Sequence, residues 1–236
     1  MGMRNYITFD GQDLSDYGVY ISGTGVFSSP ERTYETIDIP GRDGALIGRD
    51  VRLDNIELTY PAFVYSNFRE AITRVKGLLL SRTGYRQIRD TYYPEEYRMG
   101  YFAGPLEVEP TAVLDAGNFD LTFICKPQRY LLSGTISHEY TSTGYIENPT
   151  EFPSQPLITI YGTGSVTVGG VTITTGSEDA YTVIDCEAMD AYYGQENRNN
   201  TIALSGNNFP TIPAGRSDII IDGPSQVIII PRWWQV

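Results

Sequence analysis

The residue types that most often carry chemistry are few in this chain of 236 residues. It has one histidine, His138, and two cysteines, Cys125 and Cys186, which are far apart in the sequence. A single histidine excludes metal sites built from clustered histidines and gives a Ser-His-Asp triad little support. The two cysteines cannot form a disulfide framework. We interpret them as small buried side chains of a protein made in a reducing compartment.

Acidic residues are numerous, but their spacing does not indicate a site. Asp10, Asp13 and Asp16 form an acidic cluster that resembles a calcium-binding loop, but the glycine and glutamate that such a loop needs later are missing. Glu95 and Glu96 are adjacent, in a context typical of a solvated turn. A glycosidase needs two carboxylates across a cleft, which a sequence with 29 acids neither demonstrates nor excludes. We therefore expect no enzyme activity, no metal site and no cofactor.

One loop is unusually rich in turn-forming and charged residues: Pro40-Gly41-Arg42-Asp43-Gly44, which lies between two strand-like segments. The proline and the glycines predict a rigid, exposed turn that offers Arg42 and Asp43 to solvent. A guanidinium can bind a carboxylate of a neighbouring subunit through two parallel hydrogen bonds. The ordinary interpretation is a surface turn, and the functional interpretation is a contact surface between subunits.

Trp233 and Trp234, near the C-terminus, form a second candidate contact surface. Adjacent tryptophans commonly pack a terminal strand onto a domain or an interface. The alternative is that their rings stack on a sugar.

Net charge and hydropathy exclude two classes of function. The net charge is −12, whereas nucleic-acid binding requires clustered Lys and Arg to neutralise phosphates. No apolar run approaches the roughly 20 residues that span a membrane. The first residues lack the apolar segment of a signal peptide. We expect neither specific nucleic-acid binding nor membrane insertion.

Charge is distributed unevenly, which indicates two domains. Residues 1–140 contain 14 Lys and Arg and 19 Asp and Glu, whereas residues 141–236 contain 3 and 10. The second part is also richer in Gly, Thr and Ile. We predict domains at residues 1–135 and 136–236, with the proline-interrupted segment 144–153 as a connector.

The first part is predicted to be a β-sheet or barrel with one helix packed on it. Asp10-Gly11 predicts a tight hairpin turn, and polar–apolar alternation at Thr33–Ile39 predicts a half-buried strand. The helix is expected at residues 67–83, with Asn67 as its cap and Glu70 completing an Asn version of the capping box. Its apolar stripe is expected to pack on the sheet and is formed by Phe68, Ile72, Val75 and Leu79.

The second part has no helical periodicity and is predicted to be an antiparallel β-sandwich. Val168-Gly169-Gly170-Val171 has the Gly-Gly pair of a compact hairpin. The apolar runs Ile219–Ile221 and Val227–Ile230 are interpreted either as strands buried on both faces or as strands that lie against the first domain. The expected strands are Leu157–Tyr161, Gly164–Val168, Val171–Thr175, Tyr181–Asp185, Thr201–Leu204, Ser217–Ile221 and Gln226–Ile230.

Several of these segments, in this order, resemble the distal tail protein family of bacteriophages and prophages with long, non-contractile tails. The resemblance runs over nearly the whole chain, and it lies in the 40–44 loop, the 67–83 helix, Phe123–Pro127, Tyr181–Cys186 and Phe209–Gly215. It implies a tail-tube-like first domain and a galectin-like β-sandwich as the second.

The resemblance also implies a structural function. Members of this family form a hexameric ring, a hub between the tail tube and the tail-tip, baseplate and receptor-binding proteins, and leave a channel for the genome. By resemblance, the protein would be assembled in the host cytoplasm and reside at the tail tip of the virion. Six copies would carry six times −12, or −72, formal charges. We expect the channel to be acidic or neutral, so that DNA slides through without binding.

A galectin-like domain raises the alternative of a carbohydrate-binding adhesion module that recognises host cell-wall saccharide. Galectin-type sites use a His/Asn/Arg cluster with a tryptophan platform. The candidate residues here are Asn197, Arg198, Asn199 and Asn200, but the single histidine, His138, lies before residue 141, far from them in the sequence, and the tryptophans lie at the end of the chain. We therefore favour a scaffold role for the second domain.

Overall fold

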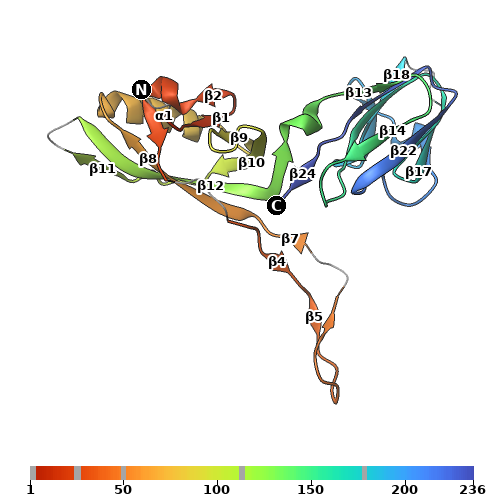
Figure 1. Cartoon of the computed structure of the whole chain (residues 1–236), viewed down its shortest axis with the longest axis horizontal. Coiled ribbons are helices and arrows are strands. Elements are labelled where there is room, and N and C mark those ends of the chain that lie inside the picture. Colours follow the sequence, from red (N-terminus) through yellow and green to blue (C-terminus); the bar gives the residue numbers. More distant parts are fainter. Residues whose placement is uncertain (1–3, 24–27, 49–51, 112–114, 177–179) are drawn as a thin grey trace. The chain divides into compact units, whose positions relative to one another are not determined.

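The computed structural model of the chain describes residues 4–23, 28–48, 52–111, 115–176 and 180–236 (Figure 1). The chain divides into two units, residues 1–129 and residues 130–235, and each has its own apolar core. This division lies a few residues before the boundary expected at residue 135. The predicted fold class, mainly β with one α-helix, is confirmed over the described residues. No helix among them is long and apolar enough to cross a membrane.

The first unit is built on one sheet with the strand order β2-β1-β9-β10-β12-β8-β3, and β11 pairs with β12. Side chains of β8 and β12 are alternately buried and open to solvent, so one face of the sheet holds the core. The strands are β1 (Ile7–Phe9), β2 (Gln12–Asp13), β3 (Val19–Ile21), β8 (Ile56–Val64), β9 (Arg86–Asp90), β10 (Glu96–Phe102), β11 (Val108–Thr111) and β12 (Ala116–Leu131), with the 3-10 helix η1 (Leu14–Tyr17) between β2 and β3.

The predicted hairpin turn at Asp10-Gly11 is confirmed. Both residues have positive φ angles, 50° and 77°, as a type I′ turn requires. Directly beside the turn, Phe9 of β1 pairs with Gln12 of β2.

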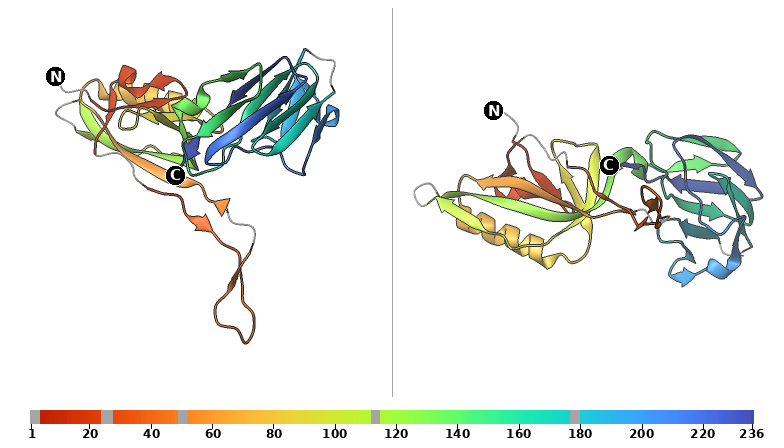
Figure 2. Two further views of the ribbon diagram at one scale, coloured as in Figure 1. Left: turned by 45° about the vertical axis from the view of Figure 1, so that its right-hand side comes forward. Right: turned by 90° about the horizontal axis from the view of Figure 1, so that it is seen from below.

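The helix α1 (Phe68–Ser81) buries the predicted stripe, and Figure 2 shows it lying along the sheet. Asn67 is the N-cap residue, as predicted, but the predicted side-chain capping box is wrong. Asn67 adopts a left-handed backbone with φ 52°, and its side chain makes no capping hydrogen bond. Instead, the carbonyl oxygen of Asn67 accepts a hydrogen bond from the Ala71 N–H at 3.0 Å. The buried residues of the helix are Ala71, Ile72, Val75, Leu78 and Leu79.

A second correction concerns the half-buried strand predicted at Thr33–Ile39. Residues 31–47 are all exposed and contribute nothing to the core. They belong to a two-stranded hairpin, here called the arm (residues 31–48 and 52–54), which leaves the sheet just before β8 (Figures 1 and 2). The arm consists of β4 (Arg32–Thr33), which pairs with β7 (Arg52–Leu53), and β5 (Thr36–Ile37), which pairs with β6 (Leu46–Ile47).

The second unit consists of two antiparallel sheets, as predicted for a β-sandwich. Their strand orders are β13-β23-β15-β18-β19-β20 and β14-β22-β16-β17-β21. The strands of these sheets are β13 (His138–Tyr140), β14 (Gly144–Asn148), β15 (Leu157–Tyr161), β16 (Gly164–Val168), β17 (Val171–Thr175), β18 (Tyr181–Asp185), β19 (Asp190–Tyr193), β20 (Glu196–Asn197), β21 (Ile202–Leu204), β22 (Gly215–Asp222) and β23 (Gln226–Ile230), with 3-10 helices η2 (Leu132–Thr135) and η3 (Asn199–Thr201). The short strand β24 (Trp234–Gln235) belongs to neither sheet.

Inward-facing side chains of both sheets form the second core, which includes Ile158, Ile160 and Ile219. The Gly-Gly hairpin is confirmed, since Gly169 and Gly170 have φ angles of 55° and 83°. The run Ile219–Ile221 is not buried on both faces, because Ile220 is 50% exposed.

The connector predicted at residues 144–153 is wrong in its first half. Residues 144–148 form β14, which pairs along its whole length with β22. The buried Asn148 side chain replaces the strand pairing that Pro149 prevents. Its amide group donates to the carbonyl oxygens of Phe152 and Ile212 at 2.9 and 3.0 Å, and its oxygen accepts from Thr150.

Candidate functional site

The tip of the arm is a tight turn that presents the predicted loop 40–44 to solvent. The Arg42 N–H donates to the Ile39 carbonyl oxygen at 3.1 Å, and Gly41 has a φ of 81°. A proline followed by a residue with positive φ is the pattern of a type II turn. Arg42 and Asp43 are both exposed beyond it, so the loop has the geometry required for a contact surface.

The arm also exposes apolar side chains, which the sequence analysis missed. Ile37 and Ile47 are 51% and 64% exposed, although they are large and apolar. An isolated two-stranded ribbon is marginal in water, and clustered exposed apolar residues mark interaction surfaces. The alternating pattern was a real signal, but alternation alone does not distinguish a half-buried strand from a free ribbon. The exposed large apolar residues of the arm are Tyr34, Ile37, Ile39, Leu46 and Ile47.

The two tryptophans lie in different surroundings. Trp233 is 3% exposed and belongs to the core of the second unit, so it offers no surface to a partner. Trp234 is partly exposed. Its ring stacks on Phe152 with centroids 4.4 Å apart, and its indole N–H donates to the Pro153 carbonyl oxygen at 3.0 Å. Both rings are thus used within the second unit.

The candidate saccharide residues lie at β20 and η3, where most of their side chains stabilise the local chain. The side-chain amides of Asn197 and Asn199 both donate to the carboxylate of Asp190, at 2.7 and 2.8 Å. Arg198 pairs with Glu196 at 2.7 Å. Asn200 is exposed within η3. A sugar would have to displace the hydrogen bonds of Asn197, Arg198 and Asn199, so this geometry does not favour a saccharide site.

The residues considered for catalysis and metal binding are dispersed. Asp10 pairs with Arg82 at 2.7 Å, and Asp13 accepts a hydrogen bond from Thr8 at 2.6 Å. Glu96 pairs with Arg129 at 3.1 Å. His138 is half-buried in β13. Among the described residues, no three His, Cys, Asp or Glu side chains are grouped to hold a metal ion.

Neither cysteine is a nucleophile. Both are buried, Cys125 in the first core and Cys186 in the second. Burial raises the pKa of each thiol to about 12. Because the thiolate is the reactive form, both side chains behave as small apolar groups near neutral pH.

The outer face of the first sheet is mostly polar and carries acidic side chains. In the paired centre of β8 and β12, every second residue lies on the face opposite the core. These residues are at positions 57, 59, 61 and 63 of β8 and at positions 118, 120, 122 and 124 of β12. These eight residues include Glu57 and Asp120 and no Lys or Arg. Thr59 and Thr122 form a cross-strand hydrogen bond at 3.0 Å. This part of the face would repel a polyanion.

Comparisons with known proteins agree with this architecture. Residues 12–125 match a family model described as phage tail protein RIFT-related domain. The crystal structure of the Dit protein of phage SPP1, described as a paradigm of the hub adsorption apparatus in phages that infect Gram-positive bacteria, is similar with a TM-score of 0.74 at 16% identity. The similarity covers 99% of this chain and 100% of that one.

A chain in the baseplate of phage p2, in its activated conformation with Sr, is similar with a TM-score of 0.53 at 12% identity, over 97% of both chains. A comparison with curated proteins gave no match. At these identities the structural similarities establish the fold, and the family model matches most of the first unit.

Proposed function

We propose that this chain has a structural function as the hub of a phage tail. Its first unit matches a phage tail RIFT-related domain, and its fold is that of a siphophage distal tail protein. In this proposal six copies close into a ring that joins the tail tube to the tail-tip and baseplate proteins. The observation that carries the proposal is the similarity to SPP1 Dit over the full length of both chains. The protein would therefore be a component of the virion tail, and its function would be binding rather than catalysis.

The arm supports the ring. A closed ring is held by head-to-tail contacts in which one surface of each subunit meets a different surface of the next. The arm offers such a surface, because its apolar residues are exposed in the single chain and its tip carries Arg42 and Asp43. Burying Ile37 and Ile47 against a neighbour would remove apolar area from water, and each fully buried side chain of this kind contributes about 1.5–3 kcal/mol.

The outer face of the first sheet supports a channel. If the centre of β8 and β12 lines the ring, Glu57 and Asp120 from six subunits face the passing DNA without a basic residue between them. Phosphates would then find no cation to bind. A ring structure determined by electron microscopy tests this arrangement. A lumen ringed with Lys or Arg would contradict it.

Native mass spectrometry and light scattering of the full chain test the ring. We expect a species of six times the chain mass. The double variant Ile37→Ser, Ile47→Ser should shift the protein to the single-chain mass at the same concentration. Both residues are exposed in the single chain, so the variant should fold.

Leu80→Ser is the matched control, because Leu80 is 65% exposed on α1, outside the arm. It should retain the six-fold mass. A wild-type protein that stays a single chain at all concentrations would overturn the ring. If the arm variant and the control lost the six-fold mass equally, the loss would not be specific to the arm. The arm would then not be assigned to the contact between subunits.

A further inference from the structure

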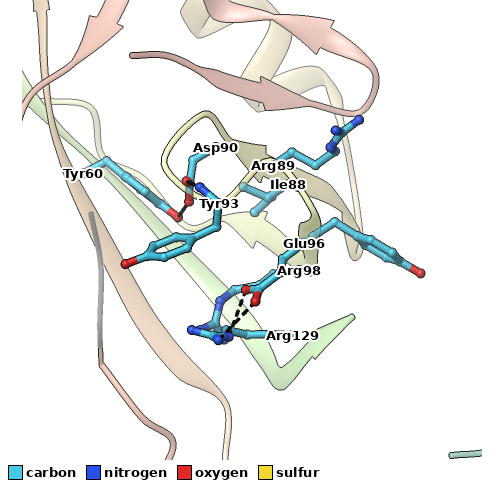
Figure 3. Close-up of a pocket in the computed structure, with 9 residues that line it drawn as sticks. Tyr60, Ile88, Arg89, Asp90, Tyr93, Glu96, Arg98 and Arg129 are labelled. Carbon is cyan, nitrogen blue, oxygen red and sulfur yellow. Dashed lines mark hydrogen bonds and ion pairs between the residues drawn. The ribbon is translucent and has the colours of Figure 1, made fainter. Parts of the chain in front are cut away.

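A small pocket lies where β8, β9, β10 and β12 meet in the first unit (Figure 3). Its cavity has a volume of about 20 Å³. Three arginines, Arg89, Arg98 and Arg129, line it together with two acids, Asp90 and Glu96. In a chain with a net charge of −12, this is a local excess of positive charge.

Both acids of the pocket are already paired, as Figure 3 shows. The carboxylate of Asp90 accepts hydrogen bonds from the Tyr60 hydroxyl and from the N–H groups of Tyr92 and Tyr93, each at 3.0 Å. The two oxygens of Glu96 face Arg129 at 3.1 and 3.3 Å. The acids therefore hold the walls of the pocket together.

These pairs give neither Arg89 nor Arg98 a carboxylate partner, and Arg98 is the more buried of the two. Arg98 is 7% exposed, and its Nη1 has no hydrogen-bond partner among the described residues. Burial lowers the pKa of Arg98 and outweighs the opposite effects of Cys125, Tyr60 and Glu96, while the charge of Arg129 acts in the same direction as burial. An arginine nevertheless stays charged in proteins, so a buried guanidinium needs a counter-charge.

The size of the cavity limits the occupant. About 20 Å³ accommodates one group of roughly the size of a water molecule. Phosphate, sulfate and larger carboxylates would extend beyond this volume. A water molecule would satisfy the hydrogen bond of Nη1 but would not compensate the charge, whereas a monatomic anion does both.

We propose that this pocket binds one halide-sized monovalent anion on the guanidinium of Arg98. The anion would complete the charge pairing at the point where the four strands meet and so stabilise the first unit. This site involves the first unit alone and does not depend on the proposed hub function.

Bromide is a suitable probe, because it replaces chloride and is identified by its anomalous scattering. In crystals of the full chain grown with bromide, we expect an anomalous peak within hydrogen-bond distance of Arg98 Nη1. Bromide peaks only at the exposed surface, or a water at Nη1, would overturn the proposal. This measurement uses the unchanged protein, so it does not depend on whether a variant folds.

A stability measurement provides an independent test. At constant ionic strength, replacing gluconate by chloride should raise the unfolding temperature of the first unit to a plateau, and sulfate should not reproduce this rise. Arg98→Gln should abolish the chloride dependence. Arg82→Gln, which removes an exposed ion pair in the same unit, should keep it. Equal effects of chloride and sulfate would show a general salt effect and no site.

Discussion

Arg232 stabilises the end of the second unit through one strong ion pair. Its backbone adopts φ 56°, and its guanidinium donates to both carboxylate oxygens of Asp185, at 2.7 and 3.0 Å. Asp185 Oδ1 also accepts hydrogen bonds from the N–H groups of Glu187 and Ala188. The ion pair therefore connects the C-terminal segment to the turn that follows β18.

Replacing Arg232 should destabilise the second unit. Arg232→Gln leaves the carboxylate of Asp185 partly buried without its cation, and the side chains of the two residues are only 23% and 19% exposed. We expect a loss of about 1.5–3 kcal/mol in the free energy of unfolding. Both tryptophans of the chain lie in this unit, so urea unfolding followed by tryptophan fluorescence measures it.

Arg216→Gln is the control for this measurement. Arg216 also pairs with an aspartate, Asp218, but both side chains are about two-thirds exposed, at 65% and 67%. Exposed pairs contribute little, so this change should cost under about 1 kcal/mol. Equal losses in the two variants would contradict the assigned function of the Arg232 pair.

The same ion pair predicts a pH dependence. Burial alone would raise the pKa of Asp185, but hydrogen bonds from Arg232 and from the Ala188 N–H outweigh it and hold the pKa below its ordinary value. A carboxyl group whose pKa is lower in the folded than in the unfolded state stabilises the fold at pH values above its unfolded pKa, which is about 3.9. That stabilisation is lost as the pH falls through the folded pKa.

We therefore expect the urea midpoint of the second unit to fall as the pH is lowered from about 5. Asp185→Asn should show a smaller fall, because its side chain does not titrate. Parallel curves for the variant and the wild type would exclude Asp185 as a source of the acid sensitivity.

At the scale of elements, one glycine lowers the stability of α1. Gly77 is exposed in the interior of the helix, and a Cβ added there meets nothing within 4 Å. Glycine in a helix interior costs about 0.5–1 kcal/mol relative to alanine. Gly77→Ala should therefore stabilise the first unit by about that amount, measured by thermal unfolding with far-ultraviolet circular dichroism.

Gly84→Ala is the matched change beyond the end of the helix. Gly84 has a φ of 73°, where a side chain is strained, so this variant should be less stable than the wild type. A stabilising Gly84→Ala, or a destabilising Gly77→Ala, would contradict the backbone argument.

The elements differ in how far the sequence predicts them. The stripe of α1 and the hairpins at residues 10–11 and 169–170 follow from local periodicity and turn chemistry, and the structure confirms them. β14 was missed because Asn148 satisfies the backbone groups of a proline-rich segment through contacts with Ile212, which is distant in the sequence. The arm was misinterpreted because alternation does not reveal whether another layer covers the strand.

The candidate sites show the same limit. The exposed turn at residues 40–44 follows from its one proline and two glycines, whereas the burial of Trp233 and the internal pairing of Asn197 and Asn199 depend on tertiary packing. Arg98 gave no signal in the sequence, because the alternation of β10 does not show that one of its buried positions holds a charge. The local sequence determines a surface turn, whereas tertiary packing determines which groups a side chain contacts.

At the scale of the whole molecule, net charge opposes assembly. Each chain carries −12, so the proposed ring of six chains would bring together −72 formal charges. Salt screens this repulsion, since the Debye length falls from about 30 Å at 0.01 M to about 3 Å at 1 M ionic strength. Raising the sodium chloride concentration should therefore shift the protein towards the six-fold mass.

Light scattering across a salt series measures this shift. Assembly that weakens as salt rises would indicate that ion pairs between subunits, such as those offered by Arg42 and Asp43, dominate over net repulsion. Sodium gluconate should act as sodium chloride does, because screening depends on ionic strength and not on the halide.

The exposed arm also makes the free subunit vulnerable. Arg32 and Arg42 lie on a ribbon whose residues 31–47 are all open to solvent, so a trypsin-like protease has ready access to both bonds. A neighbour that covers the ribbon would shield them. If the proposed ring forms, its subunits would then resist a digestion that cleaves the unassembled chain.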